Sequence, residues 1–358
     1  MTHRTLVIAE AGVNHNGSLD LALQLVDVAA EAGADVVKFQ TFKADLLATA
    51  GATKAAYQVE NTGESGSQLE MLRRLELSPE HHDVLVARCR KQGIRFMSTA
   101  FDSESLAVVA GLDMPAIKIP SGDISCAPLL LQAARLRQPL IVSSGMSTLS
   151  DIERALGVIA FGLTSDAEPS DTSDFEAAYF SDAGQAALRD CVTLLHCVTE
   201  YPAPPSSVNL RAMATMRDAF GLPVGYSDHT LGTEVSIAAV ALGATVIEKH
   251  FTLSRGMAGP DHTASLEPGE LRGLVAAIRN VEQALGSPRK QPSREEIANR
   301  TVARRSIVAA TPIRRGDILT LEMLSSKRPG TGASPMETWS LVGRTATRNY
   351  QPDDMIEP

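Results

Sequence analysis

The chain has 358 residues, of which 44% are hydrophobic and 21% charged, so it can build a sizeable core and is not globally disordered. Its net charge of −9, with no basic stripe, argues against nucleic acid as a partner, although a few lysines in a cleft can still hold an anionic substrate. No apolar run reaches the roughly 18 residues of a membrane span, and the N-terminal segment lacks the apolar run of a signal peptide, so we expect a cytoplasmic protein without a membrane partner.

Short apolar runs alternate with longer helical patterns over the first 286 residues. The predicted strands are 6–12, 34–42, 95–101, 116–121, 139–145, 192–197, 224–229 and 245–251. Helical patterns include 19–33, 78–93, 148–160, 234–244 and 267–286. Because apolar strands separated by helices pair in parallel, we predict an α/β fold, a (β/α)8 TIM barrel over residues 1–286. The alternative is a doubly wound open sheet, which the absence of a GxGxxG motif after the first strand disfavours.

Two long segments interrupt the predicted barrel, residues 43–77 and residues 161–191. Loops of this length are usually functional lids or mobile insertions, and the second could also be a dimer contact. Residues 287–304 are charged, contain proline and are predicted to form a linker or a connecting helix. Residues 305–358 carry short β-like runs with many turn residues. They predict a small β-rich domain, which is marginal alone and should dock on another surface.

Polar side chains stand at the carboxyl ends of all eight predicted strands, where a TIM barrel builds its active site. A lysine inside an apolar strand is costly to bury unless it meets an anion or a carboxylate. Three such lysines, Lys38, Lys118 and Lys249, with nearby serines and glycines, suit a phosphate and a carboxylate together. The sequence therefore predicts a site for a small anionic substrate at this end of the barrel.

Two histidines form a second group. His196 and His229 end the sixth and seventh strands, which are neighbours in a barrel. Two imidazoles with nearby oxygen ligands can hold a divalent metal and leave positions open for substrate and water. The residues alone leave the metal open between Mn²⁺, Mg²⁺, Co²⁺ and Zn²⁺, and a single histidine at a strand end is more often a structural residue.

Motifs along the whole chain resemble the sialic acid synthase family, which makes N-acetylneuraminate and related nonulosonic acids. They include IAEAGVNHNGS (8–18), VVKFQTFKAD (36–45), FMSTAFD (96–102), IKIPSGD (117–123), LLHCVTEYPAP (194–204), GYSDHT (225–230), VIEKHFT (246–252) and KRPGTGASP (327–335). The resemblance implies a TIM barrel followed by a C-terminal SAF domain, an antifreeze-like β-clip fold, over residues 305–358.

The family condenses phosphoenolpyruvate (PEP) with an open-chain N-acetylated aldose and releases phosphate by C–O cleavage. The resemblance implies that PEP is bound by Lys38, Gln40, Thr99, Lys118, Ser121 and Ser143. His196 and His229 match the family's metal-binding pair, with Mn²⁺ as the expected ion and Mg²⁺ or Co²⁺ as alternatives. The metal would act as a Lewis acid and activate water. Glu10 and Asp123 are the candidate catalytic carboxylates, and Asp123 replaces a longer glutamate that many bacterial members carry.

The resemblance also concerns the sugar and the assembly. Tyr201 and Asp228 would line the sugar pocket. Arg328 matches an arginine that, in this family, reaches from the SAF domain into the active site of the partner subunit. The chain is therefore expected to form a domain-swapped homodimer.

The main expectation is the synthesis of N-acetylneuraminate from PEP and N-acetylmannosamine. The alternative is a legionaminate or pseudaminate synthase that uses a 2,4-diacetamido-2,4,6-trideoxyhexose, because the sequence leaves the C4 and C6 substituents open. A Schiff-base pyruvate aldolase with Lys118 or Lys249 as nucleophile is a further alternative. A non-catalytic sugar-binding module is the last one, and it would need neither the lysines nor the histidine pair.

Overall fold

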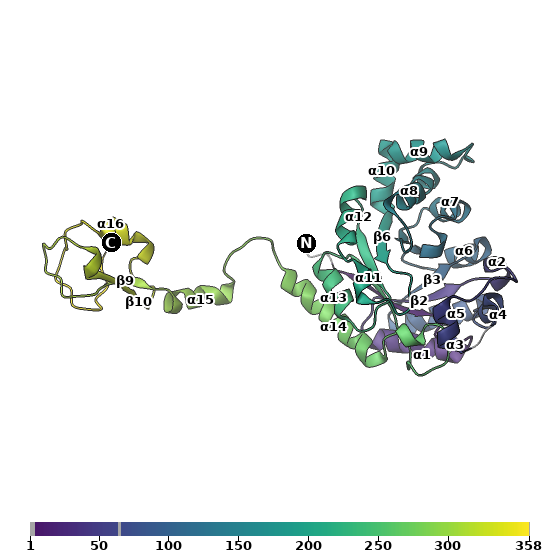
Figure 1. The fold of residues 1–358 in the computed structure, drawn as a ribbon, viewed down its shortest axis with the longest axis horizontal. Helices are drawn as coiled ribbons and strands as arrows, with labels where there is room; N and C mark the ends of the chain where they lie inside the picture. The colour runs from purple at the N-terminus through teal and green to yellow at the C-terminus, as the bar shows by residue number, and fades with distance from the viewer. Residues whose placement is uncertain (1–3, 64–65, 358) are drawn as a thin grey trace. The chain divides into compact units, whose positions relative to one another are not determined.

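The computed structural model describes residues 4–63 and 66–357, which divide into two compact units, one ending at Gly286 and the other beginning at Ser287. Among these residues, the first unit is a closed barrel of eight parallel strands in chain order (Figure 1). The strands are β1 (Leu6–Gly12), β2 (Val36–Thr41), β3 (Arg95–Ala100), β4 (Ile117–Ile119), β5 (Leu140–Ser143), β6 (Val192–Cys197), β7 (Val224–Asp228) and β8 (Val246–His250). Because β1 pairs with both β2 and β8, the predicted TIM barrel is confirmed and the open sheet is excluded.

Helices surround the barrel and carry the chain from each strand to the next. They are α1 (Leu19–Glu31), α2 (Ala44–Leu47), α3 (Ala56–Thr62), α4 (Gln68–Arg73), α5 (Pro79–Gln92), α6 (Ser103–Ala110), η1 (Ser121–Asp123), α7 (Ala127–Arg135), α8 (Leu149–Thr164), α9 (Thr172–Phe180), α10 (Asp182–Cys191), α11 (Pro205–Val208), α12 (Ala212–Phe220), α13 (Glu234–Ala241), η2 (His262–Ala264) and α14 (Pro268–Leu285). Their boundaries follow capping signals in the sequence. Ser78 caps α5, with proline in its first turn, and Thr148 forms a capping box with Asp151 at α8.

The strands present alternate side chains to the inside and the outside of the barrel. The outward side chains pack against the helices in the main apolar core. One layer of inward side chains fills the barrel below its mouth: Ile8, Val36, Met97, Ala116, Ile141, Leu195 and Val246. The inward positions two residues further along each strand therefore face the carboxyl-terminal mouth.

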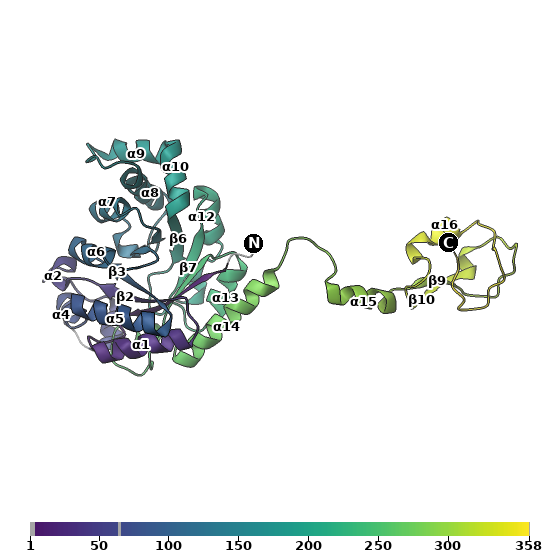
Figure 2. The same cartoon turned by 180° about the vertical axis from the view of Figure 1, so that it is seen from behind.

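Both long segments that were predicted as loops contain helices. The described residues of the segment 43–77 include α2, α3 and α4. Residues 161–191 complete α8 and add α9 and α10, which lie beside α8 (Figure 1, Figure 2). The polar residues of this segment cap its helices, because Asp171 accepts a hydrogen bond from the Ser173 N–H and Ser181 accepts one from the Gly184 N–H.

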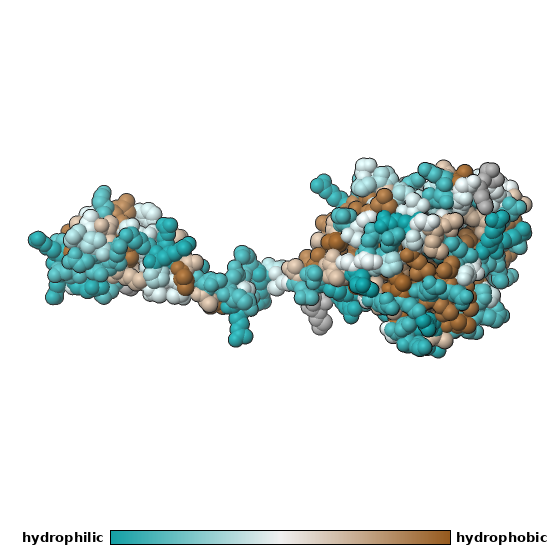
Figure 3. Space-filling view, turned by 90° about the horizontal axis from the view of Figure 1, so that it is seen from below, coloured by the Kyte–Doolittle hydropathy of each residue, from teal (hydrophilic) through white to brown (hydrophobic). Residues whose placement is uncertain are grey.

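The second unit is small. It contains α15 (Arg294–Ala303), the antiparallel strands β9 (Ser306–Ala309) and β10 (Leu324–Lys327), α16 (Thr338–Leu341), η3 (Leu321–Met323) and η4 (Pro335–Glu337). Of the two predicted forms of this segment, linker or connecting helix, the structure shows the helix α15. It is tied to the rest of the unit by the Gly330 N–H, which donates to the Thr301 carbonyl at 2.7 Å. The second unit has a core of its own, which includes Ile307, Leu341 and Tyr350, while the surface of this unit seen in Figure 3 is largely hydrophilic. None of the described helices is long and apolar enough to cross a membrane.

Candidate active site

A cavity of about 330 Å³ opens at the carboxyl ends of the barrel strands. Its volume lies in the range of roughly 300–1,000 Å³ that is typical of small-molecule sites. Each strand contributes one inward side chain to its floor: Glu10, Lys38, Thr99, Lys118, Ser143, Cys197, Ser227 and Glu248. The alternation that fills the barrel with apolar residues below therefore gives the cavity a charged and hydroxylated floor.

Two lysines and two glutamates meet on this floor. Lys38 Nζ lies 2.6 Å from Glu10 Oε2 and 3.6 Å from Glu248 Oε2. Lys118 Nζ lies 3.7 Å from Glu248 Oε1. All four side chains are buried, where an ion pair is screened little by water. Since its carboxylate neighbour is more distant, the Lys118 ammonium group is less closely paired than that of Lys38, and an anionic ligand can pair with it.

Hydroxyl groups accompany the lysines. Lys38 donates a hydrogen bond to Thr99 Oγ1 at 2.9 Å, and Lys118 donates one to Ser143 Oγ at 2.8 Å. Ser121 Oγ accepts a hydrogen bond from the Gly145 N–H at 3.0 Å. Ammonium and hydroxyl groups together bind phosphates and carboxylates well. All residues predicted to bind PEP line the cavity: Lys38, Gln40, Thr99, Lys118, Ser121 and Ser143.

The two glutamates differ in protonation. Burial raises the pKa of Glu10 to about 7, although the Lys38 ammonium opposes the shift. Burial acts on Glu248 in the same direction, but Lys118 and Lys38 outweigh it and hold the pKa of Glu248 at about 2. Glu10 can therefore exchange a proton near neutral pH, whereas Glu248 stays an anion.

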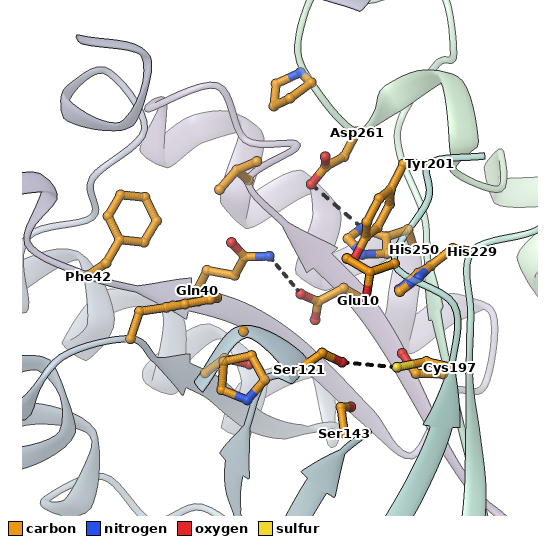
Figure 4. A pocket seen from close by; sticks show the side chains of 18 of the residues that line it. Glu10, Gln40, Phe42, Ser121, Ser143, Cys197, Tyr201, His229, His250 and Asp261 are labelled. Atoms are coloured by element: carbon orange, nitrogen blue, oxygen red, sulfur yellow. Dashed lines mark hydrogen bonds and ion pairs between the residues drawn. The ribbon is translucent and has the colours of Figure 1, made fainter. Parts of the chain in front are cut away.

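One wall of the cavity carries two histidines, with Tyr201 and Asp261 beside them (Figure 4). The ring centroids of His229 and His250 are 5.6 Å apart, and the Tyr201 ring lies 4.1 Å from His229. His229 Nδ1–H donates to the Val198 carbonyl at 2.6 Å, which leaves the lone pair on Nε2. His250 Nδ1 has no hydrogen-bond partner among the described residues and lies 3.9 Å from Asp261 Oδ2. Burial lowers the pKa of both imidazoles, to about 4 for His229, so both are neutral at pH 7.

These imidazoles are suited to hold a metal ion. Within residues 4–63 and 66–357, no group of three or more His, Cys, Asp or Glu side chains could hold a metal by itself. The two neutral rings nevertheless supply two nitrogen ligands for a metal. One of these nitrogens, His250 Nδ1, is buried and has no partner in the described structure. A first-row divalent ion bound by His229 and His250 would complete its coordination with oxygen atoms from water or substrate.

The structure does not bring His196 to the cavity. Leu195 and Cys197 face the barrel interior, so the His196 side chain between them points outward. Its Nε2–H donates to the Val208 carbonyl at 2.6 Å, and its ring lies 5.9 Å from that of Tyr226 in the layer below the helices. The expected pair of His196 with His229 is therefore corrected to His229 with His250.

Asp228 is also placed outside the cavity, for the same reason. It follows the inward Ser227 and forms an ion pair with Lys249, with 2.8 Å between Asp228 Oδ2 and Lys249 Nζ. Its predicted contact with the sugar is not supported. Lys249 cannot serve as a Schiff-base nucleophile in the cavity, because its ammonium group is on the outer side of the strands.

Asp123 and Arg328 are the remaining predicted residues. Asp123 ends η1, next to cavity residues, but does not line the cavity itself. Its Oδ2 is buried without a partner in the described part of the chain, and burial, helped by Asp102, raises its pKa to about 6. Arg328 belongs to the second unit, where its Nε–H donates to the Ala303 carbonyl at 3.0 Å.

The wall opposite the histidines is apolar, with Phe42 on the far side of Gln40 in Figure 4. It consists of Val13, Phe42, Leu47, Met71, Leu72, Leu75 and Phe101, which pack together. Sequence reasoning missed this wall, together with Glu248 and Asp261, and it placed His250 at the end of the eighth strand without giving it a role. The signal for Glu248 and His250 was the spacing of two residues in VIEKHFT, since the inward Val246 places both of them inside.

Known proteins resemble the chain over nearly its whole length. The profile of the NeuB family matches residues 25–290, and that of the SAF domain matches residues 304–358. The N,N'-diacetyllegionaminic acid synthase of Campylobacter jejuni is 46% identical over 99% of both chains, and that of Legionella pneumophila is 45% identical over 96% of this chain and 90% of the relative. The crystal structure of the N-acetylneuraminic acid (sialic acid) synthetase of Leptospira borgpetersenii matches with a TM-score of 0.66 and 31% identity, over 83% of this chain and 90% of that one. The chain therefore belongs to the NeuB family, carries a SAF domain, and is a nonulosonic acid synthase.

Proposed function

We propose that the chain condenses PEP with a 2,4-diacetamido-2,4,6-trideoxyhexose to give N,N'-diacetyllegionaminic acid and phosphate. The observation that carries this choice of sugar is the 46% identity to a synthase of that product over 99% of both chains. The sialic acid synthetase of similar structure is 31% identical. The synthesis of N-acetylneuraminate, which was the main expectation from the sequence, thus becomes the second candidate.

The floor of the cavity supports PEP as one substrate. PEP carries a phosphate and a carboxylate, and Lys118, Lys38 and the neighbouring hydroxyl groups offer the matching donors. Glu10 does not oppose this binding strongly, because a carboxyl group with a pKa of about 7 takes up a proton readily when an anion arrives. With Glu10 protonated, the ammonium groups of Lys38 and Lys118 outnumber the one remaining carboxylate, Glu248, so the floor is suited to an anionic ligand.

The apolar wall supports a deoxygenated sugar as the other substrate. The trideoxy sugar has a methyl group at C6 and an acetamido group at C4, where N-acetylmannosamine has hydroxyl groups. Met71 and Leu72 favour buried methyl groups, by about 0.8 kcal/mol per CH₂. A buried hydroxyl without a partner costs about 1–3 kcal/mol. Gln58 and Gln68, which also line the cavity, offer amide groups to the acetamido substituents.

In the proposed reaction, C3 of PEP forms a bond to C1 of the open-chain sugar. Water adds to C2 of PEP. The bond between this C2 and the oxygen that carries the phosphoryl group then breaks, so that inorganic phosphate leaves with this oxygen. Lys118 and Ser143 would hold the phosphate, and Glu10 is suited to pass a proton between the water and the new hydroxyl at C1. A divalent ion held by His229 and His250, with Mn²⁺ proposed and Mg²⁺ or Co²⁺ as alternatives, would polarise the aldehyde of the sugar.

We also propose a cytoplasmic, domain-swapped homodimer in which Arg328 reaches the cavity of the partner subunit. The match of the SAF domain to residues 304–358 and the exposure of Arg328 support this assembly. In this arrangement, the guanidinium group would contact the sugar, while PEP is bound by the barrel alone.

The test is phosphate release from PEP by metal-stripped protein reloaded with Mn²⁺. One reaction contains the trideoxy sugar and the other contains N-acetylmannosamine. We expect kcat/KM to be at least about 10-fold higher with the trideoxy sugar, as for other pockets that discriminate small substituents. A preference for N-acetylmannosamine would replace legionaminate by neuraminate as the product. Release with neither sugar, together with borohydride trapping of pyruvate on Lys118, would instead indicate an aldolase.

A further inference from the structure

A buried ion pair lies directly behind the two cavity histidines. Asp228 and Lys249 precede His229 and His250 in the chain and are partners in the parallel register of β7 and β8. Lys249 Nζ lies 2.8 Å from Asp228 Oδ2, and their side chains are 1% and 0% exposed. Because successive side chains of a strand point to opposite faces, the ion pair is outside the barrel and the histidines are inside it.

The ion pair is part of a hydrogen-bond network that surrounds the backbone of His229. Asp228 Oδ1 accepts hydrogen bonds from the Thr230 N–H at 2.9 Å and from Thr230 Oγ1 at 2.7 Å. Asp228 Oδ2 accepts one from Ser236 Oγ at 2.6 Å. Lys249 donates a second hydrogen bond, to the Thr230 carbonyl at 2.6 Å. Since Ser236 is in α13, the network joins the ends of β7 and β8 to α13, the helix that connects the two strands.

The two histidines depend on this network to different degrees. The backbone carbonyls of both histidines accept a hydrogen bond, that of His229 from the Ala203 N–H at 2.8 Å and that of His250 from the Leu266 N–H at 2.9 Å. The His229 ring is also held by its hydrogen bond to the Val198 carbonyl. His250 Nδ1, by contrast, has no partner within the described residues. The position of the His250 ring therefore depends on the backbone of β8, to which Lys249 is the adjoining residue.

Neither a net gain in stability nor contact with substrate explains these charges. A buried ion pair contributes little net stability compared with apolar residues of similar volume. Neither Asp228 nor Lys249 lines the cavity, so neither touches a ligand there. The pair does link two neighbouring strand ends by a directional contact, and a binding site made of two residues needs both of them held in a fixed arrangement.

We propose that Asp228 and Lys249 are positioning residues, which hold His229 and His250 in the arrangement in which both rings bind one divalent ion. The inference rests on the part of the proposed function that assigns a metal to these histidines, and it does not depend on the identity of the sugar. It assigns a role in the proposed reaction to two residues outside the cavity.

The test compares Mn²⁺ affinity in the full-length protein, measured by the electron paramagnetic resonance signal of free Mn²⁺. The double variant Asp228→Asn with Lys249→Met removes both charges, so that neither is left unpaired. We expect its Kd for Mn²⁺ to rise about 10- to 100-fold, as for other residues that orient metal ligands, while the KM for PEP changes less than about 3-fold. The matched control is Arg88→Met, which removes the ion pair with Asp27 between α1 and α5 and should leave both constants near their original values.

A second variant keeps the test decisive if the double variant does not fold. Lys249→Arg retains the ion pair and should bind Mn²⁺ within about 3-fold of the original protein, whereas Lys249→Gln should bind it clearly more weakly. Equal affinity in the original protein and in a folded double variant, or in Lys249→Arg and Lys249→Gln, would overturn the inference alone. Failure of the original protein to bind Mn²⁺, Mg²⁺ or Co²⁺ would overturn the metal assignment and the inference with it.

Discussion

Lys118 reaches across from β4 to Ser143 on β5, with 2.8 Å between Nζ and Oγ, and its only close carboxylate in the described structure is 3.7 Å away. This lysine therefore contributes an ammonium group that an anion can engage. We expect Lys118→Met to lower kcat/KM for PEP by at least about 100-fold, and Ser143→Ala by about 10-fold, because hydrogen bonds to charged groups contribute about 1.5–3 kcal/mol. Steady-state phosphate release measures both, with Lys91→Met on the exposed end of α5 as the control. If Lys118→Met left both KM and kcat unchanged, the assignment of PEP to this floor would be wrong.

Alanine variants of His250 and His196 should behave differently. His250→Ala removes a nitrogen donor from the cavity wall, so we expect loss of Mn²⁺ binding and of metal-dependent activity. His196→Ala removes a hydrogen bond in the outer layer, so it should lower the melting temperature but leave the Kd for Mn²⁺ within about 3-fold. Mn²⁺ titration and thermal unfolding of both variants separate these effects. Loss of Mn²⁺ binding in folded His196→Ala would restore the pair expected from the sequence.

The apolar wall should decide between sugars. Leu72 is only partly buried, so Leu72→Gln is expected to fold while it adds a polar group where the methyl groups of the sugar would lie. We predict that kcat/KM for the trideoxy sugar falls about 10-fold and that the preference over N-acetylmannosamine narrows. Val84→Gln, at an exposed position on α5, serves as the matched control. A preference that does not change in Leu72→Gln would show that this wall does not contact the sugar.

Acid should destabilise the barrel through His82. This ring is buried, with Nδ1–H donating to the Ser78 carbonyl at 2.8 Å and Nε2 lying 2.7 Å from Thr41 Oγ1. Burial lowers the pKa of His82, so the unfolded chain binds a proton at a higher pH than the folded chain does. The contribution of the neutral His82 to the free energy of unfolding is therefore fully present above the unfolded pKa, about 6.5. It decreases as the pH falls through this value toward the lower pKa of the folded state.

The measurement is the melting temperature at pH 7.5 and at pH 5.5, for the original protein and for His82→Gln. The variant should be less stable at pH 7.5 but should lose less on acidification, because it has no proton to bind at this position. Equal losses in the two proteins would show that His82 does not contribute to the acid sensitivity.

A domain-swapped dimer can be tested by complementation. Lys118→Ala disables the barrel floor, and Arg328→Ala disables the residue proposed to act in the partner subunit. A mixed dimer has one cavity with an intact floor and an intact partner arginine, so random mixing should restore about a quarter of full activity. Refolding or co-expression of the two variants, followed by an assay of phosphate release, gives the result. No recovery in a mixture that forms mixed dimers would place Arg328 outside the partner's active site.

Much of the fold followed from the sequence because strands and helices alternate so regularly. The lysines of the cavity floor could also be predicted, since Lys38 and Lys118 are charged residues inside apolar strands and must meet a polar environment. The direction in which a side chain points could not be predicted in the same way. Both faces of a barrel strand are buried, so LLHC contains no alternation of polar and apolar residues to show that Cys197 points inward and His196 outward.

The two long segments show a related limit. Residues 161–191 are rich in acidic and hydroxyl side chains, which are typical of loops but also cap helices, and Asp171 and Ser181 do the latter. Residues 43–77 contain short helices whose apolar residues turn toward the cavity rather than toward the main core. Amphipathic patterns of this length do not distinguish a wall of a binding site from the packing of a core.

The cavity takes its floor from all eight strands but most of its apolar wall from the single connection between β2 and α5. The chemistry of the first substrate is thus fixed by the scaffold that also holds the barrel closed, and it cannot vary without risk to the fold. Selection for a different sugar can act on this one connection, in which substitutions and insertions leave the strands untouched. A family with this layout can diversify its products while it keeps one reaction, and exchange of residues 43–77 between relatives is the corresponding route for engineering.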